Sequence, residues 1–347
     1  MDHLMNSTEH LYTKNEQIND VSIKKPHLVI LGAGASLQAF PNGDKNGKKL
    51  PLMNNLVEVC ELDSLLDSYQ IEWRGKNFEI IYSELKKESN LSKLSTEIES
   101  KIYSYFSSLE LPDEPTLYDH LVLSLRKKDK VATFNWDPFL FKALKRNYNR
   151  ASGQVPNAYF LHGNVAIGFC AECNSCGQTW AFCSKCNEPY LPTPLLYPIE
   201  SKNYVDDEFI SKTWTSLKAA LQHSFMLTIF GYGAPDSDKA AIKLFQEGWG
   251  NPDIRALEEV EIIDIRDEKA LVKTWKNVFI HSHHYSVKSN FYNSQIAQCP
   301  RRSVETLWAR IMDCKFHEEN PMAKSLDTFE KLEKFIAPLI EKEISQL

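Results

Sequence analysis

The 347-residue chain has no long hydrophobic run, and this absence limits where it can work. No segment reaches the roughly 18 consecutive apolar residues that a membrane span requires, so no membrane association is expected. The first 25 residues are polar and lack the apolar stretch of a secretory signal peptide. We therefore expect a cytoplasmic protein. In that reducing compartment its eight cysteines are expected to be thiols or metal ligands rather than disulfides.

The chain also lacks a strong excess of charge of either sign. Its 40 Lys and Arg residues against 46 Asp and Glu residues give a formal net charge of −6. Without a basic excess, nothing in the composition predicts direct binding to nucleic acid. Apolar residues make up 43% and charged residues 25% of the chain, which is ordinary for a globular protein with a real core.

The most informative stretch that is present runs from His27 to Ser36 and reads HLVILGAGAS. Its apolar half predicts a strand, and its small residues predict a tight turn that presents backbone N–H groups to a diphosphate, with a helix starting behind it. The third glycine of the usual G-x-G-x-x-G fingerprint is replaced by Leu37, and a plain strand-to-helix turn would use glycines too. The candidate binding residues here are Gly32, Ala33, Gly34 and Ser36.

Further short apolar runs at 131–134, 158–161, 225–230 and 260–265 predict additional strands. Several are nearly continuous, as in strands that are covered on both faces. Between the second and the third run, Ile210, Trp214, Leu217 and Leu221 recur at helical spacing. Alternation of strands and helices predicts an α/β fold with a doubly wound parallel sheet of the Rossmann type.

Polar residues follow these runs at the points where the strands should end. In an open parallel sheet, the carboxyl ends of the strands line the ligand crevice. We therefore expect a shared cavity lined by Asn135, Asp137, His162, Gly231, Tyr232 and Asp264. A lone histidine after a strand is also a common packing residue, and Asp236 and Asp238 are expected to cap the next helix.

Five cysteines fall within 17 positions and give the strongest local signal, that of a metal site. The C-x-x-C knuckles CNSC and CSKC predict a four-sulfur site for a structural Zn²⁺ made by Cys173, Cys176, Cys183 and Cys186. Gly177 and Asn187 suit the left-handed turn after each knuckle. The spare residue, Cys170, could replace Cys173 or Cys176 in another register.

Taken in order, these motifs resemble those of the sirtuin-like NAD-consuming family. The matching segments are GAGAS at 32–36, TFNWD at 133–137, LHGN at 161–164, the paired knuckles, and FGYGAPDSD at 230–238. The resemblance implies that NAD binds in an extended pose between a sheet domain and the zinc module. It implies catalytic roles for Asn135 and His162, and NAD contacts from Gly32, Ala33, Gly34, Ser36, Asn135, Asp137, Gly231, Tyr232 and Asp264.

Two departures from the family pattern favour one branch of it. The stretch at 190–204, where protein deacylases pair with their substrate peptide, contains three prolines that cannot donate to such pairing, and PNGDKNGKKLPL at 41–52 replaces the usual segment after the first loop. These changes resemble bacterial sirtuin-like NAD hydrolases of antiphage defence, which act as homo-oligomers or with a partner protein such as a motor ATPase. An NAD-dependent protein deacylase and a non-catalytic NAD or ADP-ribose sensor are the alternatives.

The resulting domain prediction has five parts. Residues 1–25 form a polar tail, and residues 26–165 with 200–290 form the NAD-binding domain. Within it, 52–112 is a helical insertion over the pocket, on which an apolar stripe with spacings of three and four starts at Leu91. Residues 166–199 form the zinc module, and 291–347 form a C-terminal helical segment.

Overall fold

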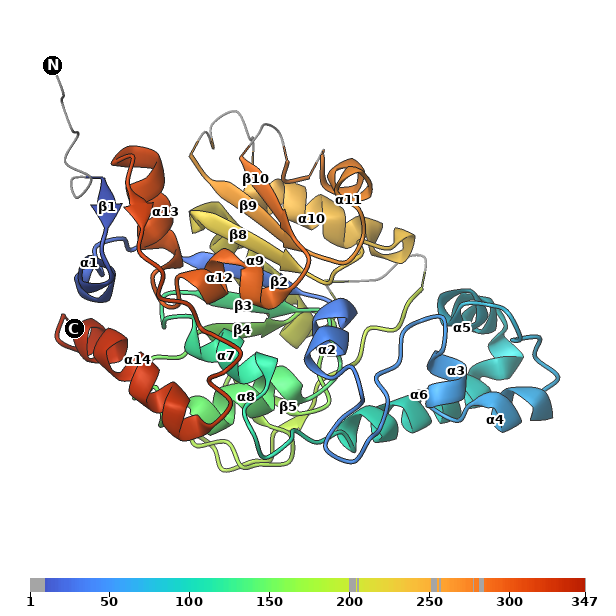
Figure 1. Ribbon diagram of the computed structural model, residues 1–347. Helices are drawn as coiled ribbons and strands as arrows, with labels where there is room; N and C mark the ends of the chain where they lie inside the picture. Colours follow the sequence, from blue (N-terminus) through green and yellow to red (C-terminus); the bar gives the residue numbers. More distant parts are fainter. Residues whose placement is uncertain are drawn as a thin grey trace, which may run out of the picture.

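The centre of the protein is a six-stranded parallel sheet in the order β10–β9–β8–β2–β3–β4 (Figure 1). The computed structural model describes residues 10–199, 204, 206–250, 255, 257–276, 278–280 and 284–346. Its central strands are His27–Leu31 (β2), Lys130–Thr133 (β3), Asn157–Phe160 (β4), Met226–Phe230 (β8), Glu259–Ile263 (β9) and Tyr285–Lys288 (β10). The predicted α/β fold with a parallel sheet is confirmed.

The chain winds outward from β2 in both directions, toward β4 on one side and toward β10 on the other. Such a reversal leaves a crevice at the carboxyl ends of the two central strands, β2 and β8. Every residue of these two strands is buried. This explains why both appear in the sequence as continuous apolar runs rather than as alternating patterns.

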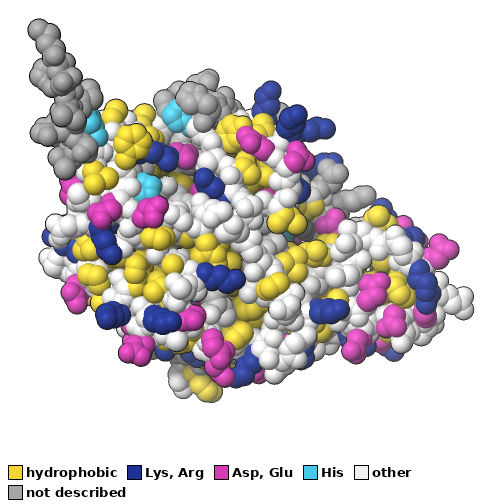
Figure 2. Space-filling view, in the orientation of Figure 1, with side chains coloured by type: hydrophobic (Ala, Val, Ile, Leu, Met, Phe, Trp, Pro, Cys, Tyr) yellow, Lys and Arg dark blue, Asp and Glu magenta, His cyan; other side chains and the backbone are white. Residues whose placement is uncertain are grey.

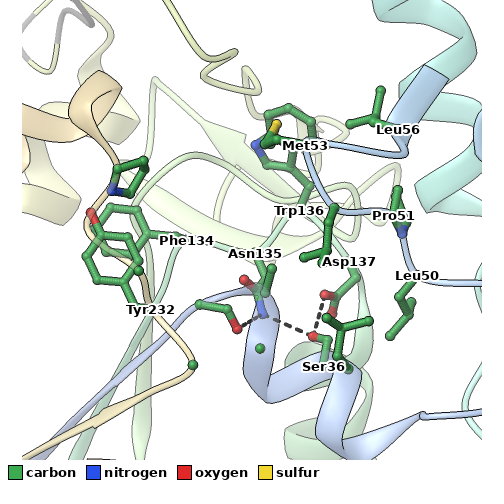
Figure 3. A pocket seen from close by; sticks show the side chains of 18 of the residues that line it. Ser36, Leu50, Pro51, Met53, Leu56, Phe134, Asn135, Trp136, Asp137 and Tyr232 are labelled. Carbon is green, nitrogen blue, oxygen red and sulfur yellow. Dashed lines mark hydrogen bonds between the residues drawn. The ribbon is translucent and has the colours of Figure 1, made fainter. Parts of the chain in front are cut away.

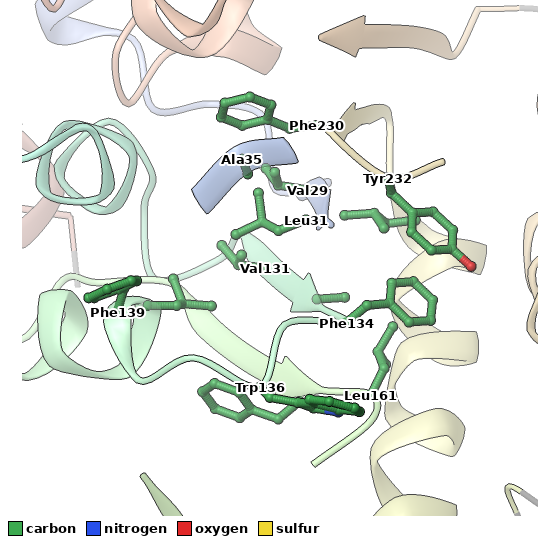
Figure 4. Close-up of a cluster of buried hydrophobic side chains, with 14 of the residues drawn as sticks. Val29, Leu31, Ala35, Val131, Phe134, Trp136, Phe139, Leu161, Phe230 and Tyr232 are labelled. Carbon is green, nitrogen blue, oxygen red and sulfur yellow. The ribbon is translucent and has the colours of Figure 1, made fainter. Parts of the chain in front are cut away.

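Helices pack around this sheet and fill its core (Figure 4). They are Ala33–Ala39 (α2), Leu117–Leu123 (α7), Phe139–Asn147 (α8), Glu208–His223 (α9), Lys239–Trp249 (α10) and Glu268–Trp275 (α11). The helix predicted from the spacing at 210–221 is α9, and its buried face includes Trp214 and Leu217. Trp214 also donates from Nε1 to the carbonyl of Leu161 at 3.1 Å, which ties α9 to the end of β4.

A group of helices lies beside the sheet, on the right of Figure 1. It comprises Leu56–Val59 (α3), Asp63–Ser68 (α4), Phe78–Lys87 (α5), the 3₁₀ turn Ser89–Leu91 (η1) and Ser92–Ser107 (α6). The apolar stripe on α6 is buried at Leu94, Ile98 and Ile102. The domain boundaries drawn from the sequence remain predictions.

A small three-stranded antiparallel sheet carries the cysteines. Its strands are Ile167–Cys170 (β5), Ser175–Gln178 (β6) and Leu191–Pro192 (β7), with β5 in the middle. The β5–β6 hairpin pairs Cys170 with Ser175 and Phe169 with Cys176. This register decides which cysteines can meet.

The two ends of the described chain lie together. Residues 10–25, which belong to the predicted polar tail, join the fold: Leu11–Tyr12 (β1) pairs with Phe316–His317 (β11), and Lys14–Asn19 (α1) packs on Phe329–Ile344 (α14). The reason is a buried guanidinium, because Arg302 donates to the carbonyls of Gln17 and Ile18. Between this region and the sheet lie Phe291–Asn293 (η4), Gln295–Gln298 (α12) and Ser303–Met312 (α13).

The surface carries both signs of charge. On the face seen in Figure 2, basic and acidic side chains are interspersed, in keeping with the small net charge. Among the described residues, no helix is long and apolar enough to cross a bilayer.

Candidate functional site

A cavity of about 810 Å³ opens where the central strands end. Residues from the ends of β2, β3, β4, β8 and β9 line one side, and the segment 50–56 lines another. The structure brings together at this cavity all the nucleotide-site residues predicted from the sequence: Gly32, Ala33, Gly34, Ser36, Asn135, Asp137, His162, Gly231, Tyr232 and Asp264. Their individual roles remain predictions.

A hydrogen-bond network fixes the polar floor of the cavity (Figure 3). The side-chain nitrogen of Asn135 donates to the carbonyl of Gly32 at 2.9 Å and to Ser36 Oγ at 3.0 Å. Ser36 in turn donates to Asp137 at 2.7 Å and lies 2.7 Å from the hydroxyl of Tyr118. Both amide hydrogens of Asn135 are therefore committed. Its Oδ1, which accepts no hydrogen bond from the described residues, is left for a ligand.

The carboxyl group of Asp137 is buried beneath this floor without a cation. Burial raises its pKa from 3.8 to about 6, although hydrogen bonds from Ser36 and from the backbone N–H of Phe139 lower it in part. No described Lys, Arg or His side chain forms an ion pair with it. Asp137 can therefore change its charge near neutral pH, which an ordinary aspartate does not do.

The glycines of the two loops are needed because the loops touch each other. A Cβ on Gly32 would lie 2.5 Å from the Gly231 carbonyl oxygen, and one on Gly34 would lie 2.8 Å from the Gly231 Cα. Gly231 itself has a positive φ of 62°. The N–H groups of Gly32 and Gly34 donate to the carbonyls of Phe230 and Gly231, so neither is presented to a diphosphate as expected. Loop packing accounts for these glycines.

His162 lines the cavity just after β4, in an aromatic setting. Its Nε2 lies 3.1 Å from the hydroxyl of Tyr204, and its ring makes a T-shaped contact with Phe134, with the centroids 4.7 Å apart. Phe134 also stacks on Tyr232, with the ring centroids 4.0 Å apart. These rings hold the imidazole in one orientation at the end of β4.

Asp264 lines the far end of the cavity, after β9, and is already engaged. Arg266 donates to its two carboxylate oxygens at 3.1 and 2.8 Å. Burial by itself would raise the pKa of Asp264, but the hydrogen bonds and charge of Arg266 outweigh it, and the pKa lies below its usual value. A ribose hydroxyl would share this carboxylate with a guanidinium that the sequence reasoning did not include.

Sequence reasoning placed a helical insertion at 52–112 over the pocket, but it named none of the apolar residues on this side of the cavity. Leu50, Pro51, Met53 and Leu56 face the polar floor from the segment that leads into α3, and Trp136 completes this side (Figure 3). The sequence did contain a signal for this side: the apolar residues LPLM at 50–53, at the end of the polar stretch that begins at 41. Tyr118, 82 residues from its partner Ser36, gave no local signal at all.

The metal cluster corrects one predicted ligand. The four sulfurs that lie within 4.8 Å of one another belong to Cys170, Cys173, Cys183 and Cys186, and Cys176 is not among them. The β5–β6 hairpin makes CAEC at 170–173 the first knuckle and leaves Cys176 exposed on β6. The left-handed residue after the first knuckle is accordingly Asn174 (φ 49°) and not Gly177, as had been predicted. After the second knuckle it is Asn187 (φ 63°), in agreement with the prediction.

The donor set fits a structural zinc ion. Four thiolates satisfy the tetrahedral preference of Zn²⁺ and leave no coordination position for a substrate. None of the four cysteines lines the cavity described above. The cluster can therefore stabilise the small sheet but has no direct part in chemistry at the cavity.

Comparison with known proteins gives matches to structures alone. No protein-family model and no curated protein matches the sequence. The chain is similar in structure to a Sir2 homologue in complex with NAD, with 14% identity, a TM-score of 0.41, and 84% of this chain and 93% of that chain covered. It is also similar to a mutant Sir2 homologue in complex with ADP-ribose, with 11% identity, a TM-score of 0.37, and coverage of 96% and 97%. At TM-scores this low, the residues of the cavity must carry any functional conclusion.

Proposed function

We propose that the cavity binds NAD and hydrolyses the bond between nicotinamide and ribose. The observation that carries this proposal is the fixed amide of Asn135, whose donors are used by Gly32 and Ser36 while its Oδ1 remains available. That oxygen can accept a hydrogen bond from the attacking water or from the carboxamide of nicotinamide. Cleavage of an N-glycosidic bond passes through an oxocarbenium-like transition state, so a positioned water and nearby negative charge are what it needs.

The residues at the cavity can supply each part of the step. The water oxygen attacks C1′ of the ribose, the bond from C1′ to the pyridinium nitrogen breaks, and its electron pair leaves with neutral nicotinamide. His162 accepts the proton of the water, a task suited to imidazole at neutral pH. Asp137, ionised above its pKa of about 6, places negative charge behind Ser36, where it favours a cationic ribose.

The remaining contacts place the dinucleotide along the cavity. Ala33 begins α2, so its N–H has no partner within that helix and can face a phosphate. Gly231 and Tyr232 lie against this turn from β8, and Asp264 lies at the end where the adenosine ribose would be. This assignment puts nicotinamide near Asn135 and His162, under the apolar segment 50–56.

One feature favours water over an acyl-lysine peptide as the second substrate. The segment after β7 lies beside His162, and the N–H of Leu196 already donates to the His162 carbonyl at 2.9 Å. Pro194 and Pro198 have no N–H to offer a peptide strand. A substrate strand would thus find few free donors on this edge.

The resemblance to antiphage effectors extends the proposal to regulation. An enzyme that depletes NAD must be held inactive, and the helices around segment 50–56 are placed to control access to the cavity. We expect low activity in the isolated chain and higher activity in a homo-oligomer or with a partner such as a motor ATPase. Nicotinamide release measured over a wide range of protein concentration tests this; turnover that is maximal and independent of concentration in a monomer contradicts it.

The central experiment measures nicotinamide release from NAD by Asn135→Ala, His162→Ala and the unchanged protein. Each substitution should lower turnover by roughly 10²-fold or more, with a much smaller change in NAD affinity. Asn149→Ala, at an exposed site away from the cavity, is the matched control. Activity of Asn135→Ala within a few-fold of the unchanged protein would refute the proposal. If an acyl-lysine peptide is deacylated faster than NAD is lost without peptide, the deacylase alternative is favoured. If NAD binds tightly and is not cleaved, the sensor alternative is favoured.

A further inference from the structure

Three of the described α-helices begin directly after an aspartate, and one of these three aspartates does not cap its helix. Asp207 and Asp267 precede α9 and α11, and each side chain accepts a hydrogen bond from a backbone N–H in the first turn. Asp238 ends a 3₁₀ turn, Asp236–Asp238 (η2), and stands in the same position before α10, but its side chain makes no capping bond. The capping role expected for Asp238 was therefore wrong, and its carboxylate is used elsewhere.

The carboxylate of Asp238 instead contacts other residues that line the cavity. One oxygen accepts a hydrogen bond from the hydroxyl of Tyr232 at 2.8 Å, and the other lies 3.8 Å from Nε2 of His162. Both Asp238 and His162 are buried, with exposed fractions of 3% and 5%. Two groups of opposite potential charge thus lie together where water screens them little.

We propose that Asp238 is a positioning residue that stabilises positive charge on His162 during turnover. This inference rests on the proposed hydrolysis, in which His162 accepts a proton from the attacking water and later releases it to solvent. In this step the proton passes from the water to the imidazole and then to solvent, and Asp238 is not an acceptor of it. Its negative charge makes the protonated imidazole more favourable, as a buried carboxylate does beside a catalytic histidine.

The aromatic groups described around His162 and Asp238 cannot take this role. Burial raises the pKa of both Tyr204 and Tyr232 above the ordinary value, so both phenols stay neutral at any working pH. Phe134 contributes an uncharged ring. Of the named neighbours of His162, Asp238 is the one that carries charge.

The test is Asp238→Asn, which removes the charge and keeps an acceptor for Tyr232. Without the carboxylate, His162 should lose its proton at lower pH, so the acidic limb of kcat against pH should move down by about one pH unit. We expect kcat at neutral pH to fall about 10-fold or more, because the imidazolium formed in the transition state is less stable, while KM changes little. A purely structural role for Asp238 would leave the position of the limb unchanged.

Two further variants separate the alternatives. Asp267→Ala removes a true helix cap, so it should lower the melting temperature and leave the pH profile in place. Tyr232→Phe removes the hydrogen bond to Asp238 but keeps its charge, so the limb should stay where it is. If Tyr232→Phe moves the limb as far as Asp238→Asn does, Asp238 acts by holding Tyr232 and the inference fails.

An NMR titration of the His162 ring carbons, without NAD, tests the pair independently of catalysis. Its midpoint should be lower in Asp238→Asn than in the unchanged protein, and equal midpoints overturn the inference. If the unchanged protein never releases nicotinamide, the proposed function fails, yet this titration still decides whether the two groups interact. If nicotinamide is released and neither the titration nor the kinetic limb moves, the hydrolase stands and the role of Asp238 does not.

Discussion

Two buried regions of this protein handle negative charge in opposite ways. Near the C-terminal end of α14, the carboxylate of Glu343 accepts hydrogen bonds from Arg301 and Arg302, which directly precede α13. Burial by itself would raise the pKa of Glu343, but the two guanidinium groups outweigh it and the pKa lies below its usual value. At the cavity floor, Asp137 has only hydroxyl and N–H donors, and burial raises its pKa to about 6.

The difference separates a structural charge from one held ready for a ligand. A carboxylate that is already paired with arginines of the chain cannot also pair with a cationic ligand. The charge of Asp137, in contrast, would be balanced only by a cation that binds in the cavity. A raised pKa does not suffice by itself to mark a site. Burial also raises the pKa of Glu261 in β9 to about 7, yet Glu261 is bonded to Thr228 and Gln295 and does not line the cavity. The cavity beside Asp137 makes the distinction.

In the cysteine cluster, the negative charge of the thiolates would be balanced by a metal ion rather than by side chains of the protein. Disrupting this cluster gives the largest expected effect. Cys170→Ser should abolish binding of about one equivalent of zinc and unfold the small sheet, because the free energy of metal binding is also folding free energy. Cys176→Ser is the matched control and should keep its zinc, since its sulfur lies outside the cluster. The zinc content of both purified variants is measured. If Cys176→Ser loses zinc and Cys170→Ser keeps it, the ligand set predicted from the sequence is the right one.

Breaking the balanced cluster should cost nearly as much. Glu343→Ala leaves Arg301 and Arg302 buried without their shared counter-ion, so the free energy of unfolding should fall by about 3–5 kcal/mol. Glu341→Ala, at an exposed position of the same helix, should change it by less than about 0.5 kcal/mol. Urea denaturation measures both. Equal, small effects would mean that the arginines do not depend on Glu343.

The sequence predicted the cavity floor better than it predicted what surrounds it. Continuous apolar runs locate the buried strands, and in a parallel sheet the residues after them must gather at one edge, so Asn135 and His162 could be found. The choice between Cys170 and Cys176 could not be made, because C-x-x-C spacing occurs at both 170–173 and 173–176 and only the hairpin register decides. Contacts distant in sequence, such as that of Tyr118 with Ser36, follow from tertiary packing alone.

Removing the charge of Asp137, which no described cation balances, should raise the free energy of unfolding, whereas removing that of Glu343 should lower it. Between pH 3.8 and about 6 the folded state holds a proton on Asp137 that the unfolded state has lost, so this group's contribution to stability falls as pH rises through that window. Asp137→Asn should therefore gain up to roughly 3 kcal/mol over the unchanged protein above pH 6, with no gain below pH 4. The same variant should release nicotinamide more slowly. Urea denaturation from pH 4 to 8 measures the gain, and parallel curves for the two proteins would contradict it.

The smallest expected effect concerns Tyr118, which supports the floor from below. Tyr118→Phe removes the hydroxyl that lies 2.7 Å from Ser36 Oγ, while Ser36 still donates to Asp137 and still accepts from Asn135. The free energy of unfolding should fall by about 1 kcal/mol, the usual net value of one buried hydrogen bond. Turnover should stay within a few-fold, because the amide of Asn135 keeps Gly32 and Ser36 as acceptors and loses only its longest contact, of 3.4 Å to the Tyr118 hydroxyl. A loss of activity as large as that of Asn135→Ala would instead show that the tyrosine hydroxyl, rather than the amide, orients the reacting groups.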